Sequence, residues 1–496
     1  MNERQRSSRF DRSDDIVVMK FGGTSVEDAA AIQRLIAIVQ SRSEAQPVVV
    51  VSALAGVTDQ LLEAGKAAAQ GHLGAALSLV REIYIRHERM ADDLVSSGLH
   101  GILDRELRCE LRELEALLRD LEASRSLGHE KFDREALDLR TQDRLLGFGE
   151  CLSSRLVRAA LCEAGVNAAH VDARSCIVTD GRHGQANPLW DATNQRLQDY
   201  LSPILESRQG PVLGGFIAAT EDCIPTTLGR GGSDFSAAII GAAVGAARIE
   251  IWTDVDGVMT ADPKICPDAR VIRRMSFDEA AEMAHFGAKV LHPATLTPAV
   301  QANIPVFVLN SRRPQEKGTE IAAHAASGDV VSAIAAKRKV ASVEVNVRKP
   351  FDSDLLRAVS AVFDRHHCPV DILTTTLGRL SLLVRSDANL SSIAADLQGL
   401  DRESLGEVRW ENHQALVSLI GKNVCRRPDV ASRAFAAMSD MNVRMVCPGA
   451  SGRTISFLVE ESNAAESVRR LHAEFFAEPK LAHDWGGDSS AYCQAG

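Results

Sequence analysis

The chain has 496 residues and a formal net charge of −10, with 45% hydrophobic and only 4% aromatic residues. Its length predicts two to four domains, and its acidic balance gives no general attraction to nucleic acid or to an anionic membrane. No apolar run is long enough to span a bilayer. Ten cysteines occur without a C-x-x-C pair, which argues against a zinc site or a disulfide framework and favours reduced thiols in a cytoplasm.

Residues 1–14 are charged and lack an apolar core, so we expect a disordered tail and no signal peptide.

A glycine turn follows the first apolar run. Residues 16–19 are predicted to form a buried strand, which is followed by Lys20-Phe21-Gly22-Gly23-Thr24-Ser25 and an amphipathic helix. The glycines, the helix N-terminus and the Lys20 charge together indicate a phosphate cradle. An ordinary strand-to-helix turn, with Ser25 as N-cap and Asp28 as its partner, stays open.

Short apolar runs alternate with helices along the N-terminal part of the chain. The runs at 48–51, 212–216, 249–252 and 304–309 are typical of fully buried strands, which predicts a mostly parallel sheet covered on both faces. Between Asp59 and Glu150 the chain is predicted to be helical. Helix-period leucines from Leu103 to Leu121 could form a partner-binding coiled coil, but their short extent favours a helix packed within the domain.

Further clusters suited to chemistry follow the first turn. In Gly229-Arg230-Gly231-Gly232-Ser233-Asp234, Arg230 suits a carboxylate or phosphate, and Ser233 or Asp234 suits the cap of the next helix. Thr253-Asp254 follows a predicted strand, at the sheet edge where open α/β folds bind ligands. Glu150, and lysines such as Lys289, are weaker signals, since each alone is typical of a solvated surface charge.

The sequence pattern changes after about Gly318. Residues 321–339 are weakly patterned and suit a linker or a connecting helix. Residues 340–412 are predicted to be a β-α-β-β-α-β ferredoxin-like unit, and the order begins again over residues 413–480. The adjacent His366, His367 and Cys368 could bind a metal, although neighbours on a helix point apart and a helix end is favoured. Residues 481–496 are expected to form a loose tail.

Taken together, these motifs resemble the signature set of the aspartate kinases. The resemblance rests on Lys20–Val26, Ser52–Thr58, Gly149-Glu150, Gly229–Asp234, Thr253-Asp254 and Phe286–Pro293, in that family's order. It implies an amino-acid-kinase-type open α/β sandwich over residues 15–320 with a mostly parallel sheet, followed by two ferredoxin-like α+β ACT domains. It also implies ATP- and Mg²⁺-dependent phosphorylation of the β-carboxylate of L-aspartate to 4-phospho-L-aspartate, the first step toward lysine, threonine and methionine.

The resemblance implies a role for each matched position. Lys20 and Asp234 would be catalytic, with Lys20 at the transferring phosphoryl group. Thr58, Glu150, Arg230 and Ser233 would bind aspartate, with Arg230 on its α-carboxylate and Glu150 on its α-ammonium. The nucleotide would be bound by Lys20, Phe21, Gly22, Gly23, Thr253, Asp254, Met259, Lys264, Lys289 and Val290. No metal held by protein side chains is implied, and no general base is needed because the substrate carboxylate is already ionised at pH 7.

Two positions depart from the family pattern. Met259 stands where the family usually has an aromatic residue on the adenine side, which affects the expected nucleotide affinity only. Leu377 stands where lysine-sensitive relatives carry a glutamate. The implied effector is lysine and/or threonine, expected at Lys349, Asp352, Leu355, Asp371 and Thr376. The ACT units are also expected to carry the contact of a homodimer or higher homo-oligomer.

The motifs also allow two other interpretations of the protein's function. Another kinase of the amino-acid-kinase fold would lack the paired ACT tail. A non-catalytic amino-acid-sensing ACT protein would be expected to lose Lys20, Arg230 or Asp234, and all three are present. The 20 residues after Phe476 (496 − 476) are expected to be too few for a fused homoserine dehydrogenase domain.

Overall fold

The computed structural model describes residues 16–42, 44–126, 137–288, 293–324, 330–348, 352–376, 378–400 and 405–477. These residues divide into an N-terminal unit, residues 16–259 and 271–324, and a C-terminal unit, residues 260–270 and 330–477. The tails expected at residues 1–14 and 481–496 lie outside the described residues.

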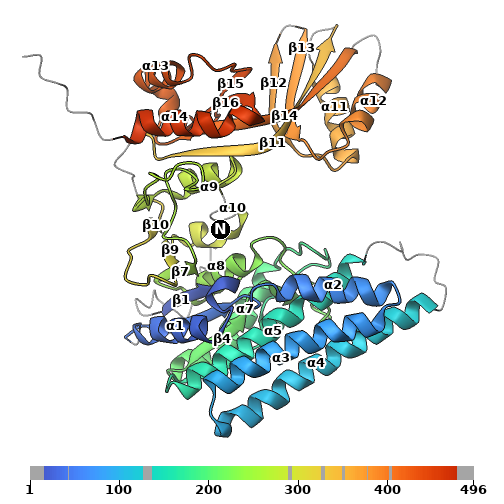
Figure 1. Cartoon of the computed structure of the whole chain (residues 1–496), viewed down its shortest axis with the longest axis vertical. Helices are drawn as coiled ribbons and strands as arrows, with labels where there is room; N and C mark the ends of the chain where they lie inside the picture. Colours follow the sequence, from blue (N-terminus) through green and yellow to red (C-terminus); the bar gives the residue numbers. More distant parts are fainter. Residues whose placement is uncertain are drawn as a thin grey trace, which may run out of the picture. The chain divides into compact units, whose positions relative to one another are not determined.

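An eight-stranded sheet forms the centre of the N-terminal unit (Figure 1). Its order is β3-β4-β2-β1-β7-β9-β10-β8, and neighbouring strands are parallel except β9 and β10, which confirms the predicted mostly parallel sheet. Every residue of β1 is buried, as expected for a strand covered on both faces. The strands are β1 (Ile16–Phe21), β2 (Gln46–Val51), β3 (Ala168–Val171), β4 (Gly210–Gly214), β7 (Arg248–Thr253), β8 (Arg274–Met275), β9 (Val306–Asn310) and β10 (Thr319–Ile321), with β5 (Ile217–Ala219) and β6 (Pro225–Thr227) as a separate hairpin.

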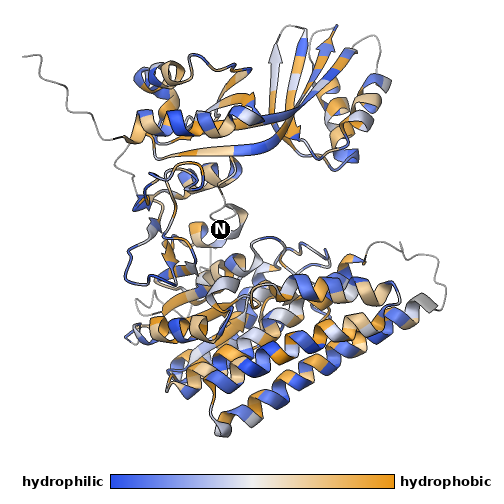
Figure 2. Ribbon diagram, in the orientation of Figure 1, coloured by the Kyte–Doolittle hydropathy of each residue, from blue (hydrophilic) through white to orange (hydrophobic). Residues whose placement is uncertain are grey.

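Helices surround this sheet, and four of them pack against one another as a layer of their own: α2, α3, α4 and α5 (Figure 1). The leucines between Leu103 and Leu121 are buried in the core of the unit, which confirms the packed-helix interpretation. Figure 2 shows the same helices banded in polar and apolar residues. The helices are α1 (Ala29–Gln40), α2 (Val57–Ala69), α3 (Leu73–Leu94), α4 (Ser97–Ser126), α5 (Leu139–Glu163), α6 (Ala173–Cys176), α7 (Trp190–Glu206), α8 (Gly232–Val244), α9 (Phe277–His285) and α10 (Pro293–Gln301), with a short 3₁₀ turn η1 (Gly23–Ser25). None of the described helices is long and apolar enough to cross a membrane.

The C-terminal unit contains one six-stranded antiparallel sheet of order β12-β13-β11-β14-β16-β15. Its strands are β11 (Ala333–Val347), β12 (Val370–Thr376), β13 (Arg379–Arg385), β14 (Leu405–Ile420), β15 (Met445–Pro448) and β16 (Thr454–Glu460). Its helices are α11 (Ser353–Arg365), α12 (Leu390–Gly399), α13 (Pro428–Ala437) and α14 (Ala464–Phe476), with 3₁₀ turns η2 (Val424–Arg426) and η3 (Glu461–Asn463). His366 forms the C-cap of α11 and its ring contacts Asp396, so the helix-end interpretation of His366-His367-Cys368 is confirmed.

The predicted linker at residues 321–339 is wrong over its last part, because residues 333–339 belong to strand β11. β11 and β14 pair along nearly their whole length, from Ala333 opposite Ile420 to Val347 opposite Leu405. The first half of β11 therefore completes the second ferredoxin-like unit, and the second half begins the first. The pairing shifts register between Lys337 and Val340, and the neighbouring residues Lys339 and His413 have positive φ. The apolar alternation of residues 333–337 is weak, which is why the sequence alone did not reveal this strand.

Candidate active site

An ion pair lies at the carboxyl edge of the parallel sheet. Lys20 is the fifth residue of β1, and its Nζ lies 2.7 Å from Oδ1 of Asp234, in the first turn of α8. The side chains are only 11% and 15% exposed. Little water therefore screens this pair, and the ammonium is held in one place. The structure thus brings together the two residues that the sequence predicted as catalytic.

The glycine turn after Lys20 is held by the neighbouring strands. The N–H of Gly22 donates to the carbonyl of Trp252 at 3.1 Å. This N–H is therefore not free for a phosphate, contrary to the predicted nucleotide-binding role of Gly22. Ser25 is not the N-cap of α1. Its hydroxyl donates to Trp252 O and to Ser311 Oγ, and the N-cap is Asp28, which accepts from Ala31 N at 2.7 Å. The predicted phosphate contact of the Gly23 backbone stays a prediction.

Glu150 lies on α5 and is buried beside the same edge, with 4% of its surface exposed. Its Oε1 accepts a hydrogen bond from Ala53 N at 3.1 Å, and its Oε2 has no hydrogen-bond partner among the described residues. Burial raises the pKa of Glu150 to about 8, although the nearby Lys20 charge acts in the opposite direction. A buried carboxyl oxygen without a partner is costly unless a ligand supplies one. Glu150 is thus suited to an ammonium group.

A hydrogen bond between two serines joins the loop after β2 to helix α8 beside the ion pair. Ser52 Oγ, just after β2, donates to Ser233 Oγ on α8 at 3.0 Å. A Cβ added at Gly215 would lie 2.8 Å from Cα of Ser233, so the chain after β4 needs a glycine there. Neither Ser233 nor Asp234 caps α8, contrary to the prediction, because the N-cap is Gly231.

Arg230 projects from a loop that only glycines can form. Gly229 and Gly231 on either side have φ of 75° and 74°, in the left-handed region. Arg230 is exposed, and Thr58 is half-buried in the first turn of α2. Neither side chain is hydrogen-bonded to Lys20, Asp234 or Glu150, so their substrate roles stay predictions.

The predicted nucleotide residues separate into groups. Thr253 ends β7 at the sheet edge, and its hydroxyl donates to Oδ1 of Asp254 at 3.2 Å. Phe21 is fully buried and stacks on Trp252, so its side chain is not available to a nucleotide. Met259 is half-buried in the N-terminal unit, whereas the exposed Lys264 belongs to the C-terminal unit. Lys289 and Val290 lie outside the described residues.

The predicted effector residues also differ in their contacts and in their exposure. Asp352 is the N-cap of α11, accepting from Leu355 N at 2.8 Å, and Leu355 is part of the buried core. Asp371 is paired with Lys337, whose Nζ lies 2.6 Å from its Oδ2. Thr376 is exposed at the end of β12, and Lys349 lies outside the described residues, as does Leu377.

Sequence reasoning missed Asp143, which organises the loops around Arg230. Asp143 is 1% exposed and accepts from His183 Nδ1, Gly184 N and Thr227 Oγ1. A Cβ at Gly229 would lie 3.2 Å from Gly184 O, so this carboxylate fixes the backbone against which the Arg230 loop rests. An apolar-to-polar break inside the helical stretch was its only signal in the sequence. Ser52 lies in one of the recognised motifs, but its bond to Ser233 was not predicted, nor was the bond of Ser311 to Ser25, because serines in loops are common.

The arrangement as a whole joins one ammonium, two carboxyl groups and a glycine turn at the end of a parallel sheet. This combination can hold an anionic group that transfers beside Lys20 and a cationic group at Glu150. It suits phosphoryl transfer to a small molecule that carries an ammonium group. The model of the amino acid kinase family matches residues 15–310, and a model of an ACT domain matches residues 417–475.

Relatives of this chain narrow the class further. The chain is 34% identical over 471 residues to lysine-sensitive aspartokinase 3 of Escherichia coli, covering 93% of this chain and 99% of that protein. It is 35% identical to the chloroplastic aspartokinase 3 of Arabidopsis thaliana, covering 92% of this chain and 81% of the relative. The crystal structure of E. coli aspartokinase III with aspartate and ADP superposes with a TM-score of 0.79 at 32% identity, covering 93% of this chain and all of that one. The chain therefore belongs to the aspartokinases, the amino acid kinases that phosphorylate aspartate.

Proposed function

We propose that the chain transfers the γ-phosphoryl group of ATP to the β-carboxylate of L-aspartate, giving 4-phospho-L-aspartate and ADP, the first step toward lysine, threonine and methionine. The observation that carries the proposal is the buried Lys20–Asp234 pair beside the unpartnered oxygen of Glu150. A non-catalytic amino-acid sensor would have no use for this pair. The E. coli structures that contain aspartate with ADP, or aspartate with lysine, support the same substrates.

Each residue has one task in this proposal. Lys20 and the N–H of Gly23 neutralise charge on the transferring phosphoryl group, and Asp234 holds Lys20 in place. Glu150 binds the α-ammonium of aspartate and Arg230 its α-carboxylate, with Thr58 and Ser233 as further polar contacts. The β-carboxylate attacks without a general base, since it is ionised at neutral pH.

Mg²⁺ is proposed to bind with the nucleotide phosphates and not to protein side chains. Asp234 is paired with Lys20 through Oδ1, and the described residues contain no group of three or more His, Cys, Asp or Glu side chains that could hold a metal ion. When bound, the ion neutralises phosphate charge. Thr253 and Asp254, at the end of β7, would lie on the nucleotide side together with Lys289 and Val290.

Feedback control is proposed for the C-terminal unit, with lysine and/or threonine as effector. Its support is the ACT match and the lysine complex of the E. coli relative. We also propose that the sheet edge at β12, where Leu373 is 39% exposed, carries the homodimer contact. A cytoplasmic site of action is supported by the free thiols of the described cysteines.

A coupled assay of ADP formation tests the proposal. ATP consumption should depend on both L-aspartate and Mg²⁺, and 4-phosphoaspartate should be trapped as its hydroxamate. Lysine, threonine and methionine are then added singly and in pairs, beside a measurement of mass in solution. ADP formation that is indifferent to aspartate would overturn the proposed reaction.

A further inference from the structure

Two backbone segments of the candidate site lie close together. The strands that precede them, β1 and β2, are paired as far as Phe21 and Val51, but the segments themselves are not paired as strands. One is the turn after β1, residues 22–28, and the other is the loop after β2, residues 52–56. Their first contact is the N–H of Ser52, which donates to Phe21 O at 3.1 Å. A Cβ added at Gly23 would lie 3.1 Å from Ala53 O and 3.5 Å from Ala55 N. The phosphate side and the aspartate side of the site are therefore in direct backbone contact.

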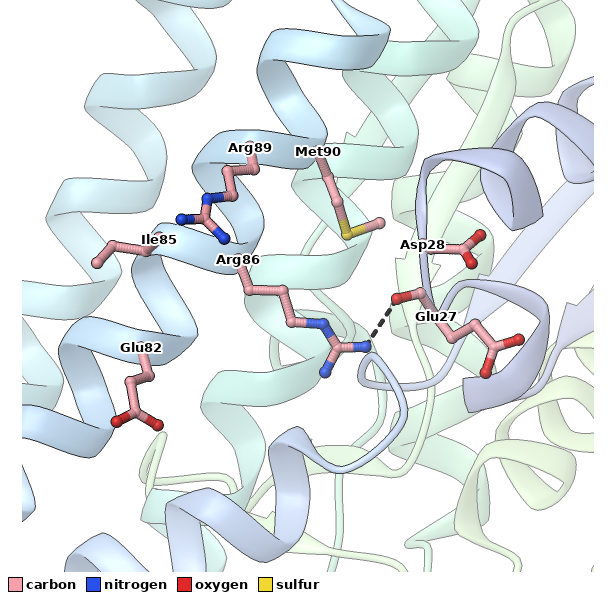
Figure 3. A pocket seen from close by; sticks show the side chains of 7 residues that line it. All are labelled: Glu27, Asp28, Glu82, Ile85, Arg86, Arg89 and Met90. Atoms are coloured by element: carbon pink, nitrogen blue, oxygen red, sulfur yellow. Dashed lines mark hydrogen bonds between the residues drawn. The ribbon is translucent and has the colours of Figure 1, made fainter.

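One side chain from α3 bonds to both segments. Arg86 Nη1 donates to the carbonyl of Ala55 at 2.7 Å, and Nη2 of the same guanidinium donates to the carbonyl of Glu27 at 2.7 Å. Figure 3 shows Arg86 reaching from the helix toward the backbone of Glu27. The two donors of a guanidinium are fixed in one plane, so the two carbonyls are held at a set separation. Bonds from a charged donor are also stronger than neutral ones.

The helix that carries Arg86 is itself fixed. The neighbouring His87 is fully buried, with its Nδ1 2.8 Å from Ile83 O, and burial lowers its pKa to about 4. His87 is therefore neutral near pH 7 and packs as part of the core. Ile83 and Met90 are buried on the same side of α3. The base from which Arg86 extends is thus rigid, whereas the segments that it joins are turns.

Arg89 gives an internal comparison. Arg89 and Arg86 line the same open pocket, together with Glu27, Asp28, Glu82 and Met90. Arg89 is exposed, and in Figure 3 it does not point toward the Glu27 backbone. The two arginines carry the same charge and lie on the same helix, α3, but only Arg86 reaches the carbonyls of Ala55 and Glu27.

We propose that Arg86 is a positioning residue. It fixes the glycine turn against the Ser52–Gly56 loop, so that the γ-phosphoryl group of ATP and the β-carboxylate of aspartate are aligned for transfer. The inference rests on the proposed function for its kinetic consequence, but not for its structural one. Both Nη groups of Arg86 are engaged by backbone carbonyls, so in this proposal Arg86 does not bind substrate; its loss should lower kcat for aspartate phosphorylation by about 10-fold to 100-fold, while nucleotide affinity changes little.

The test compares Arg86→Ala, Arg86→Lys and Arg89→Ala in the full chain. Arg86→Lys keeps the charge and the stem, but its single ammonium does not span two carbonyls in the same plane. Both Arg86 variants should lose kcat, with the affinity for ADP measured by calorimetry within about twofold of the wild type. Guanidinium chloride, far below denaturing concentration, should restore part of the activity of Arg86→Ala because the pocket is open; sodium chloride should not. Arg89→Ala should resemble the wild type throughout.

Hydrogen exchange gives a readout that does not depend on activity. In both Arg86 variants the amides of residues 22–28 and 52–56 should exchange faster, while those of β1 and β2 keep their protection. Wild-type kcat with unchanged exchange in both loops would overturn the inference, as would faster exchange across the whole unit. If Arg86→Ala fails to fold, Arg86→Lys decides. Failure of the proposed function would appear differently, as wild-type protein without aspartate-dependent ADP formation.

Discussion

Glu150 and Ala53 are joined by a hydrogen bond of 3.1 Å, which ties α5 to the loop after β2 and leaves the second oxygen of Glu150 facing no described partner. Because burial raises the pKa of this carboxyl to about 8, the ligand-free protein holds a proton there at neutral pH. An ammonium ligand favours the ionised form, so binding of aspartate should release that proton.

The first prediction is therefore a pH dependence. The value of kcat/KM for aspartate should rise as pH increases, with a midpoint near pH 8 and a plateau about one pH unit higher, since this ratio reports ionisation in the free enzyme. Calorimetry of an unreactive aspartate analogue at neutral pH, in buffers of different ionisation enthalpy, should show proton release. Glu150→Gln should bind aspartate weakly at every pH and show no such step. A profile that is flat from pH 6 to pH 9 in the wild type would contradict this assignment.

The same group gives a stability prediction. The pKa of Glu150 is higher in the folded protein than its ordinary value of 4.5, so between pH 4.5 and about 8 the folded state binds more protons than the unfolded state. The free energy of unfolding should then fall as pH rises through this interval. Thermal melts of wild type and Glu150→Gln should diverge toward alkaline pH, with the glutamine variant gaining relative to the wild type.

The catalytic pair yields a third prediction. Lys20→Ala should lower kcat by far more than about tenfold, because the lysine charge acts on the transition state. Its fold should persist by circular dichroism. Lys66→Ala, which removes an exposed lysine of α2, is the matched control and should keep wild-type kcat. Retention of more than about a tenth of wild-type kcat, which corresponds to a loss under roughly 1.4 kcal/mol, would remove Lys20 from the catalytic role.

Arg230 separates substrate from nucleotide. Arg230→Ala should raise KM for aspartate much more than KM for ATP, because a forked guanidinium–carboxylate contact is lost. Arg230→Lys keeps the charge without the fork and should recover only part of the affinity. Equal effects on both KM values would instead place Arg230 at the phosphates.

The ion pair between Lys337 and Asp371 predicts how the effector competes. An amino acid whose ammonium binds Asp371 must first displace Lys337, whose Nζ lies 2.6 Å away. Lys337→Met should therefore lower the concentration of lysine needed for half-inhibition, and Asp371→Asn should raise it. Lys339→Met makes the same charge change at an exposed position two residues along and serves as control. Unchanged inhibition in Lys337→Met would place the effector away from Asp371.

The parallel sheet and the Lys20 turn could be predicted because fully apolar strands and glycine-rich turns leave strong local patterns. Partners far apart in sequence could not. The bond from Gly22 N to Trp252, the capping by Asp28 in place of Ser25, and the core position of Leu355 each depend on which strand or helix lies alongside. Asp143 was missed for the same reason, since its partners at Gly184 and Thr227 are more than forty residues along the chain.

The long pairing of β11 with β14 limits where the C-terminal unit can be cut from the rest of the chain, because each strand contributes one half to each ferredoxin-like unit. Residues 333–337 pair with residues 416–420, so a fragment that begins at Val340 would leave the backbone groups of the buried half of β14 open on one side. Such an edge takes a strand from another molecule. A fragment cut there would assemble through a swapped strand, and its apparent oligomer would be an artefact of the cut. Only a fragment that starts before Ala333 preserves both halves of the sheet and measures the native association.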